Sequence, residues 1–364
     1  MRFPEFSGEW EMVSLQDIAT INPKSDPLQN TFIYIDLEAV EKGELRKIQE
    51  IMREEAPSRA QRVIDNNDIL FQCVRPYQKN NYIHRILNTS NQQWVASTGY
   101  AQIRTTELPN YIYHLLNTDE FNRKVMVRCT GSSYPAINSE DLATIHLYYT
   151  PDKKEQLKIS RLLDLLDKRI ATQNKIIEKL QSLIKGIRVC CMQRVYGNNV
   201  YLSEIAQIYQ PQTISSTELT EDGFLVYGAN GIIGKYKDYN HETEQICITC
   251  RGNTCGMVNY TKPMSWITGN AMVINTDKYQ DKVCKRYLYH YLSAYNFNSI
   301  ISGSGQPQIV RTPLEKLKIT LPTISEQKQK AIIFDKIQDK IDINHKVLNL
   351  YIGQKQYLLR QMFI

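Results

Sequence analysis

The sequence predicts an α+β protein: two mixed α/β modules in a pseudo-twofold arrangement, separated and joined by two long antiparallel coiled-coil helices. Three observations predict this class. The 364-residue chain contains an internal repeat, each copy ends in a sustained heptad pattern, and short strand-like runs lie outside the heptads. We expect modules at residues 1–151 and 196–322 and helices at 152–195 and 323–364.

The repeat is clearest where each module meets its helix. The segment 132–137, Pro151 and the pair Glu155-Gln156 return further along the chain as the segment 304–309, Pro322 and Glu326-Gln327. From Pro151 and Pro322 onward the offset is a constant 171 residues, so that Asp164 falls on Asp335. Tyr111–His114 is echoed by Tyr287–His290, but most of the intervening sequence diverges. Repeated segments with divergent sequence between them predict two related modules that each recognise a different ligand.

The first heptad segment begins after Pro151, where Asp152 can cap a helix. From Ile159 to Cys191 a 4,3 spacing is apolar at every position except Gln173. More than four heptads at this spacing are typical of a coiled-coil seam.

The second seam runs from Lys330 to Met362 at the same offset, and Asn344 takes the position of Gln173. A polar residue at one central seam position fixes the register of a coiled coil. We therefore predict that Gln173 and Asn344 face each other in an antiparallel pair. In the alternative, each helix packs only on its own module.

Both modules show a mixed texture. We expect strands at 32–35, 69–74, 246–248 and 271–274, and short amphipathic helices at 111–116 and 286–292.

Composition excludes few functions. The hydrophobic fraction of 42% and the charged fraction of 23% indicate a folded globular protein. The net charge of +6 resides mainly in the two helical segments, and the modules themselves are not strongly basic. Composition alone therefore does not indicate that the protein binds nucleic acid. We expect a cytoplasmic protein, because no apolar run is long enough for a membrane helix and the N-terminus lacks a signal-peptide core.

Signatures of metal binding and catalysis are weak. Cys247 and Cys250 form a CxxC without a second pair, so we expect reduced core thiols, with a zinc site as the alternative. The stretch 228–236 resembles a phosphate loop, but its spacing is one residue too long and Tyr236 replaces the metal-binding hydroxyl. A turn between strands is expected there, and the chain is predicted to be non-enzymatic.

In the order of these features, the chain resembles the specificity subunit of type I DNA restriction-modification systems. Each module is followed by a Gly-Ser-x-x-Pro-x-Ile segment, a Pro-x(3)-Glu-Gln helix start and a long heptad helix. The opening Arg2–Trp10 and the stretch 227–234 are also similar to segments common in that family, and the resemblance covers the whole chain. One departure is Tyr134, where the family often has Gln before the proline, as Gln306 in the second copy.

The resemblance implies a division of labour. Each module would be a target-recognition domain that reads one half of a split double-stranded DNA sequence, and the helices would set the gap between the halves. Two methyltransferase subunits would dock on the helices, and restriction-translocase subunits would complete the complex. S-adenosylmethionine, ATP and Mg²⁺ would bind to those partners, and no cofactor is expected in this chain.

Polar residues in turns that follow the predicted strands, and in the repeated Gly-Ser segments, are the candidates for DNA contact, because such groups read base edges and phosphates. For each one, the alternative is a turn residue that satisfies the local backbone. The candidates are Arg75, Lys79, Asn80, Ser132, Ser133, Tyr134, Asn230, Arg251, Asn253, Ser304, Gln306 and Gln308.

Two rival functions stay open on sequence alone. The chain could be a two-module coiled-coil scaffold that binds proteins without DNA specificity, or an enzyme whose catalytic residues are scattered. Salt-sensitive, sequence-specific DNA binding in complex with a methyltransferase subunit would favour the specificity function.

Overall fold

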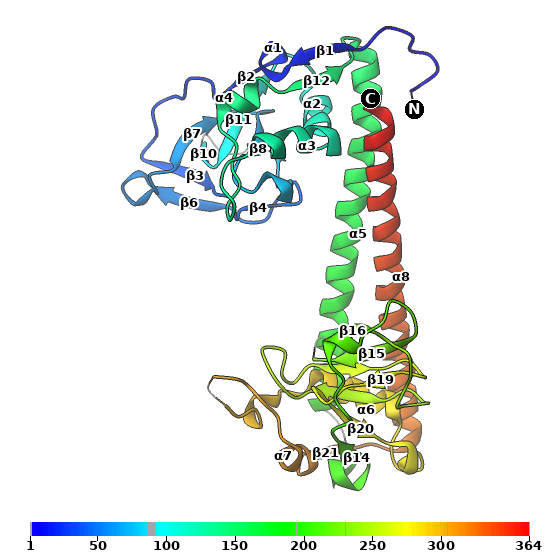
Figure 1. Ribbon diagram of the computed structural model, residues 1–364. Helices are drawn as coiled ribbons and strands as arrows, with labels where there is room; N and C mark the ends of the chain where they lie inside the picture. The colour runs from blue at the N-terminus through cyan, green and yellow to red at the C-terminus, as the bar shows by residue number, and fades with distance from the viewer. Residues whose placement is uncertain (1, 86–91, 194–195, 230, 304, 364) are drawn as a thin grey trace. The chain divides into compact units, whose positions relative to one another are not determined.

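The computed structural model describes residues 2–85, 92–193, 196–229, 231–303 and 305–363 (Figure 1). It forms two compact units, each described by itself. Unit 1 comprises Met1–Asn174 and Val347–Ile364, and unit 2 comprises Lys175–Lys346. Each unit therefore holds one module together with part of each long helix.

The two long helices begin and end close to the expected positions. They are α5 (Lys153–Gln193) and α8 (Ile324–Met362). Asp152 caps α5, since its carboxylate accepts hydrogen bonds from the backbone NH groups of Lys154 and Glu155 at 2.8 and 3.3 Å. At α8 the Glu326 carboxylate accepts from the backbone NH of Thr323 at 3.0 Å, which forms half of a capping box.

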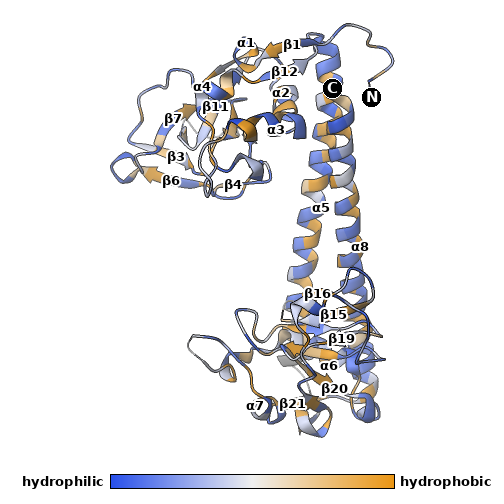
Figure 2. Cartoon of the chain, viewed as in Figure 1, coloured by the Kyte–Doolittle hydropathy of each residue, from blue (hydrophilic) through white to orange (hydrophobic). Residues whose placement is uncertain are grey.

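The helices pack in antiparallel fashion within each unit. In unit 1, Leu163 near the start of α5 shares a buried cluster with Leu358 near the end of α8. In unit 2, Ile184 near the end of α5 packs with Phe334 and Ile341 in the first half of α8. Apolar and polar residues alternate along both helices (Figure 2), as the heptad pattern predicts. No described helix is long and apolar enough to span a bilayer.

The two polar seam residues fall in different units. Gln173 in unit 1 is only 8% exposed, and the amide of Asn344 in unit 2 donates to the Lys340 carbonyl at 2.6 Å. Their pairing stays a prediction.

The module of unit 1 contains the predicted strands and helix among further elements. The strands are β1 (Glu11–Ser14), β2 (Ala19–Ile21), β3 (Thr31–Ile35), β4 (Val40–Glu41), β5 (Glu44–Leu45), β6 (Gln49–Met52), β7 (Ala60–Ile64), β8 (Ile69–Gln72), β9 (Tyr82–Ile83), β10 (Gln93–Ser97), β11 (Tyr100–Thr105) and β12 (His146–Tyr149). The helices are α1 (Leu15–Ile18), α2 (Pro109–Leu116), α3 (Asp119–Arg128) and α4 (Ser139–Ala143), with 3-10 turns η1 (Arg53–Glu55) and η2 (Pro76–Gln78).

Two four-stranded sheets form this module, in the orders β6-β3-β10-β7 and β2-β11-β8-β9. Strands β3 and β10 are parallel, whereas their other neighbours are antiparallel. Strands β1 and β12 form a separate ladder, as do β4 and β5. The largest core cluster joins β8 and β11 to α2, α3 and the first turns of α5.

The module of unit 2 contains nine described strands. They are β13 (Asn198–Tyr201), β14 (Gln207–Tyr209), β15 (Phe224–Gly228), β16 (Gly231–Tyr236), β17 (Ile246–Thr249), β18 (Val258–Tyr260), β19 (Trp266–Ile267), β20 (Ala271–Asn275) and β21 (Lys318–Leu321). The helices are α6 (Lys285–Ala294) and α7 (Arg311–Glu315), with 3-10 turns η3 (Leu202–Glu204), η4 (Ser216–Glu218), η5 (Asp277–Tyr279) and η6 (Phe297–Ser299).

The topology of unit 2 repeats that of unit 1. The order β14-β20-β17-β18 matches β2-β11-β8-β9, and the parallel pair β15–β19 matches β3–β10. Strand β16 occupies residues 231–236 of the stretch that resembled a phosphate loop, so this stretch forms a strand and does not lead into a helix N-terminus. The α+β class, the duplicated module and the two long helices are confirmed.

The same hydrogen bond joins module to helix in both units. His114 at the end of α2 lies 2.8 Å from Asp164 of α5, and His290 of α6 lies 2.7 Å from Asp335 of α8. All four residues lie in repeat-related positions, and both histidines are fully buried. A short bond between a buried histidine and a partly buried aspartate restrains each module against its own helix.

In unit 2 this bond belongs to a larger network. Burial alone would raise the pKa of Asp335, but hydrogen bonds from His290 and Arg286 outweigh that effect and lower its pKa. Burial lowers the pKa of His290, so this ring is neutral at pH 7. Its Nδ1 then accepts from the Arg188 guanidinium at 2.7 Å, while Nε2 donates to Asp335.

Asp335→Asn should destabilise unit 2 by about 1–3 kcal/mol at pH 7, because it removes the charged acceptor of a half-buried network. The lowered pKa of Asp335 means that its stabilising effect is complete only well above the unfolded-state pKa of about 4, and is lost as pH falls through the folded-state value. Urea unfolding of the variant and wild type should therefore converge in acid. Asp339→Asn, at an exposed site on the same helix, is the control; equal loss in both variants would contradict this role.

Candidate nucleic-acid interface

Three backbone segments meet beyond the end of strand β8 in unit 1. Val74 and Thr130 each form a β-bridge to Ala136, and Thr130 and Ala136 exchange two hydrogen bonds of 2.9 Å. This pairing makes residues 131–135 a closed loop. Gly131 at its base has φ 89°, and a Cβ there would lie 3.0 Å from the Tyr134 carbonyl oxygen, so the tight turn favours glycine.

Arg75 lies beside this loop and is held in place by it. Its backbone NH donates to the Pro135 carbonyl at 2.8 Å, and its φ of 55° places it in the left-handed region. The guanidinium lies over the ring of Tyr134, 4.3 Å from the ring centroid. Tyr134 is 62% exposed, and Arg75 has no ion-pair partner among the residues that the structure describes. The pair therefore presents an oriented cation at the module surface.

Lys79 and Asn80, two further candidates, have partners inside unit 1. The Lys79 ammonium donates to Asp119 at 2.8 Å and to the Asn117 carbonyl at 3.2 Å. The Asn80 side-chain oxygen accepts from the backbone NH of Lys42 at 3.0 Å. These bonds tie the turn η2 to the rest of the module. They support the alternative that both residues satisfy local structure, and DNA contact by them stays a prediction.

Unit 2 repeats the loop nearly hydrogen bond for hydrogen bond. Ser302 and Gln308 exchange two bonds of 2.8 Å, and Arg251 bridges Gln308. The Ile309 NH donates to the Cys250 carbonyl at 3.0 Å, as that of Ile137 does to Cys73 at 3.1 Å. Gly303 at the loop base has φ 91°, close to the value of Gly131. Both loops therefore rest on one backbone design.

This pattern shows that the two candidate arginines are not equivalent. The Gly252 NH donates to the Pro307 carbonyl at 2.9 Å, which is the bond that Arg75 makes to Pro135. Arg75 thus corresponds to Gly252, also left-handed at φ 84°, and Arg251 corresponds to Val74. The sequence alone predicted that the two arginines follow matching strands. The β-bridges show that they do not occupy equivalent positions, because the residue that matches Arg75 is one position after Arg251.

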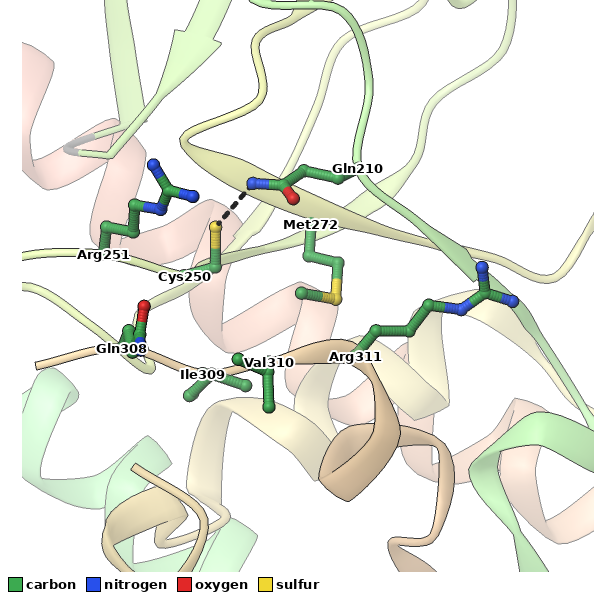
Figure 3. Close-up of a pocket in the computed structure, with 8 residues that line it drawn as sticks. All are labelled: Gln210, Cys250, Arg251, Met272, Gln308, Ile309, Val310 and Arg311. Atoms are coloured by element: carbon green, nitrogen blue, oxygen red, sulfur yellow. Dashed lines mark hydrogen bonds between the residues drawn. The ribbon is translucent and has the colours of Figure 1, made fainter. Parts of the chain in front are cut away.

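A pocket of about 230 Å³ opens beside Arg251 (Figure 3). Gln308 lies at its edge, and two polar residues that were not sequence candidates, Gln210 and Arg311, also line it. The Gln210 amide donates to the Gly269 carbonyl and lies 3.6 Å from the Cys250 sulfur, so its orientation is fixed. Arg311 follows the repeated Pro-x-Ile segment by two residues, and that proximity was the available sequence signal.

Four of the remaining candidates have exposed side chains, and two lie outside the described residues. Ser132, Ser133, Asn253 and Gln306 are exposed on the described loops. Asn230 and Ser304 lie outside the described residues. The structure thus gathers Arg75 and residues 132–134 at one surface of unit 1, and Arg251 and Gln308 at one surface of unit 2.

The CxxC cysteines lie in separate environments. Cys247 belongs to one buried cluster and Cys250 to another, as expected for residues three apart along an extended strand. Burial raises the pKa of the Cys247 thiol to about 12, which keeps it protonated. Core packing therefore explains both residues. The described residues contain no group of three or more His, Cys, Asp or Glu side chains placed to hold a metal ion.

Comparisons with known proteins agree on one family. The family model described as "Type I restriction modification DNA specificity domain" matches residues 7–182 and 198–350. The chain is 31% identical over 147 residues to the type I restriction enzyme EcoprrI specificity subunit of Escherichia coli, covering 39% of this chain and 36% of that protein. It is 23% identical over 186 residues to the HindI specificity subunit of Haemophilus influenzae, covering 50% and 37%. These matches span about a third of the length of either relative.

The fold is similar to that of solved structures. The S subunit of a type I restriction-modification system from M. genitalium superposes with a TM-score of 0.68 at 15% identity, covering 98% of this chain and 96% of that one. A chain from work on complex assembly of the type I R-M system gives a TM-score of 0.59 at 20% identity, covering 97% of both. At these identities the likeness concerns the fold alone.

Arg75→Ala should weaken binding to a specific DNA target by about 1–3 kcal/mol, as expected for loss of a bidentate contact to a base. Tyr134→Ala should also weaken binding, because the guanidinium loses its support, whereas Tyr134→Phe keeps the ring and should bind as the wild type does. Arg251→Ala should have a similar effect through the other half of the target. Titration of labelled DNA by fluorescence anisotropy measures each affinity.

Arg123→Ala is the matched control, since this exposed arginine pairs with Glu120 on helix α3, apart from the loop. Equal effects of Arg75→Ala and Arg123→Ala would reduce the role of Arg75 to general charge.

Proposed function

Because the chain belongs to the type I restriction modification DNA specificity domain family, we propose that it selects the DNA target of a type I restriction-modification complex. The observation that carries this proposal is the duplicated loop. Equivalent backbone hydrogen bonds close a loop beside Arg75 in one unit and beside Arg251 and Gln308 in the other.

Similar loop backbones with unlike side chains suit a target in two parts. Each loop offers a comparable surface to a groove of double-stranded DNA, while the donors and acceptors differ. Arginine pairs with the two acceptors on the major-groove edge of guanine, and glutamine pairs with the edge of adenine. Each module therefore reads its own half-site.

The long helices supply the spacing and the partner surface. We assign to α5 and α8 the setting of the gap between half-sites. Both also expose large apolar side chains: Leu165 and Leu183 on α5 are 57% and 49% exposed, and Ile343 and Leu350 on α8 are 58% and 73% exposed. Exposed apolar residues of this size support docking of protein partners, here two methyltransferase subunits.

The chemistry belongs to the partners in this proposal. Methyltransferase subunits bind S-adenosylmethionine, and restriction-translocase subunits use ATP and Mg²⁺, while this chain is a non-catalytic cytoplasmic subunit that positions them. A scaffold without DNA specificity is not favoured, because the matched family is one of DNA specificity domains.

Exchange of one module tests the proposal. Replacing residues 1–151 with the equivalent domain of a relative, in complex with the methyltransferase subunit, should change one half-site and leave the other unchanged. Selection of bound sequences from random DNA gives the readout. The chain without its partners is the control, and it should transfer no methyl group from S-adenosylmethionine.

A changed sequence in both half-sites, with folding intact by circular dichroism, would contradict the proposed division between the modules. Methyl transfer by the chain alone would contradict its non-catalytic role.

A further inference from the structure

A groove of about 670 Å³ lies in unit 2 between the end of α5, the residues after α6 and the first half of α8. Its apolar lining includes Ile184, Val189 and Ile341, and its charged residues are Lys185 and Arg188. No Asp or Glu is among the described residues that line it. The groove therefore has a mixed polar and apolar lining that carries two positive charges and no negative charge.

The charge of Arg188 is incompletely matched. One guanidinium nitrogen donates to His290, but its Nε is buried and has no acceptor among the described residues. The nearby carboxylate, Asp335, already accepts from Arg286 and His290. Burial lowers the pKa of Arg188, which reflects the cost of holding this charge away from water. Lys185 is exposed and has no ion-pair partner in the described part of the chain.

Unit 1 shows how the corresponding positions are filled when carboxylates are present. By the 171-residue offset, Ile184 and Val189 of unit 2 correspond to Lys355 and Arg360 of unit 1, and Gln338 corresponds to Asp167. Lys355 binds Asp167 at 2.5 Å.

Asp119 is the second carboxylate of unit 1 that forms an ion pair with a cation of α8. Arg360 binds Asp119 at 2.9 Å, and Lys79 binds this same carboxylate at 2.8 Å. Unit 2 has Tyr295 in place of Asp119. Unit 1 thus pairs two cations with carboxylates at positions where unit 2 has neither the cations nor the carboxylates. By the same offset, Lys185 and Arg188 of unit 2 correspond to the uncharged Gln356 and Leu359, so the two cations of the unit 2 groove have no counterpart in unit 1.

We propose that the groove of unit 2 receives an acidic segment of a partner protein, with a carboxylate between Lys185 and Arg188 and apolar neighbours against Val189 and Tyr295. The inference rests on the proposed function only in naming that partner as a methyltransferase subunit. Charge complementarity selects an acidic occupant, and the accessible apolar side chain of Val189 beside the two cations favours a protein segment over a small anion. The two units then engage their partners by different contacts.

Zero-length carbodiimide cross-linking of the assembled complex tests this directly, because the reagent joins an amine only to a carboxylate in contact with it. Mass spectrometry should identify Lys185 joined to an Asp or Glu of the methyltransferase subunit. Lys179, exposed and about 1.7 turns earlier on α5, is the internal control and should give no such product.

Two substitutions extend the test to affinity. Lys185→Gln should weaken binding of the methyltransferase subunit by about tenfold and reduce the salt dependence of binding, whereas Lys179→Gln should leave both unchanged. Gln338→Asp, which restores the carboxylate found in unit 1, should also weaken binding, because it supplies the groove with its own acid. Isothermal titration calorimetry measures each affinity.

The outcomes separate this inference from the proposed function. If the wild-type complex assembles and binds specific DNA, but Lys185 gives no cross-link and Lys185→Gln binds as the wild type does, the groove assignment alone is wrong. If the wild-type chain binds neither the methyltransferase subunit nor specific DNA, the proposed function and this inference are both overturned.

Discussion

The hydrogen bond between a buried histidine of each module and an aspartate of a long helix is the constraint on which the rest of the structure depends. His114 with Asp164, and His290 with Asp335, are repeat-related pairs at 2.8 and 2.7 Å. A module that could pivot on its helix could not hold its loop at a fixed place on DNA. Because each histidine is fully buried, losing the bond leaves a ring nitrogen without its acceptor, and this cost resists pivoting. In the proposed function, this repeated anchor makes helix length the determinant of the gap between the two half-sites.

Apart from this hydrogen bond, the two units share the backbone geometry of their loops, but the side chains on those loops differ. The loops at residues 131–135 and 303–307 share their bridges and glycines, yet one presents a cation stacked on an aromatic ring and the other presents arginine and glutamine beside a pocket. The same separation applies where partners would dock, since Asp167 and Asp119 in unit 1 give way to Gln338 and Tyr295 in unit 2. The two copies thus keep the backbone contacts that position each surface, whereas the side chains on that surface differ.

Much of the fold was predictable because it follows from periodicity. The heptads from Ile159 and from Lys330 predicted α5 and α8, and the apolar runs predicted β3, β8, β17 and β20. Site details depend on contacts between segments far apart in sequence, which periodicity does not encode. The equivalence of Arg75 with Gly252 comes from hydrogen bonds to Pro135 and Pro307. Likewise, the ion pair of Lys79 with Asp119 and the position of Arg311 beside Arg251 needed the folded chain.

The central claim is that two reading modules are held at a distance set by the long helices, and a change in helix length tests it most directly. Inserting one heptad into each helix preserves both seams and lengthens each helix by about 10 Å, or about three base pairs of B-DNA. Selection from random DNA by the assembled complex should then return both half-sites unaltered, with a gap about three base pairs longer. An unaltered gap with intact half-sites would show that the helices do not set the spacing and would contradict the account.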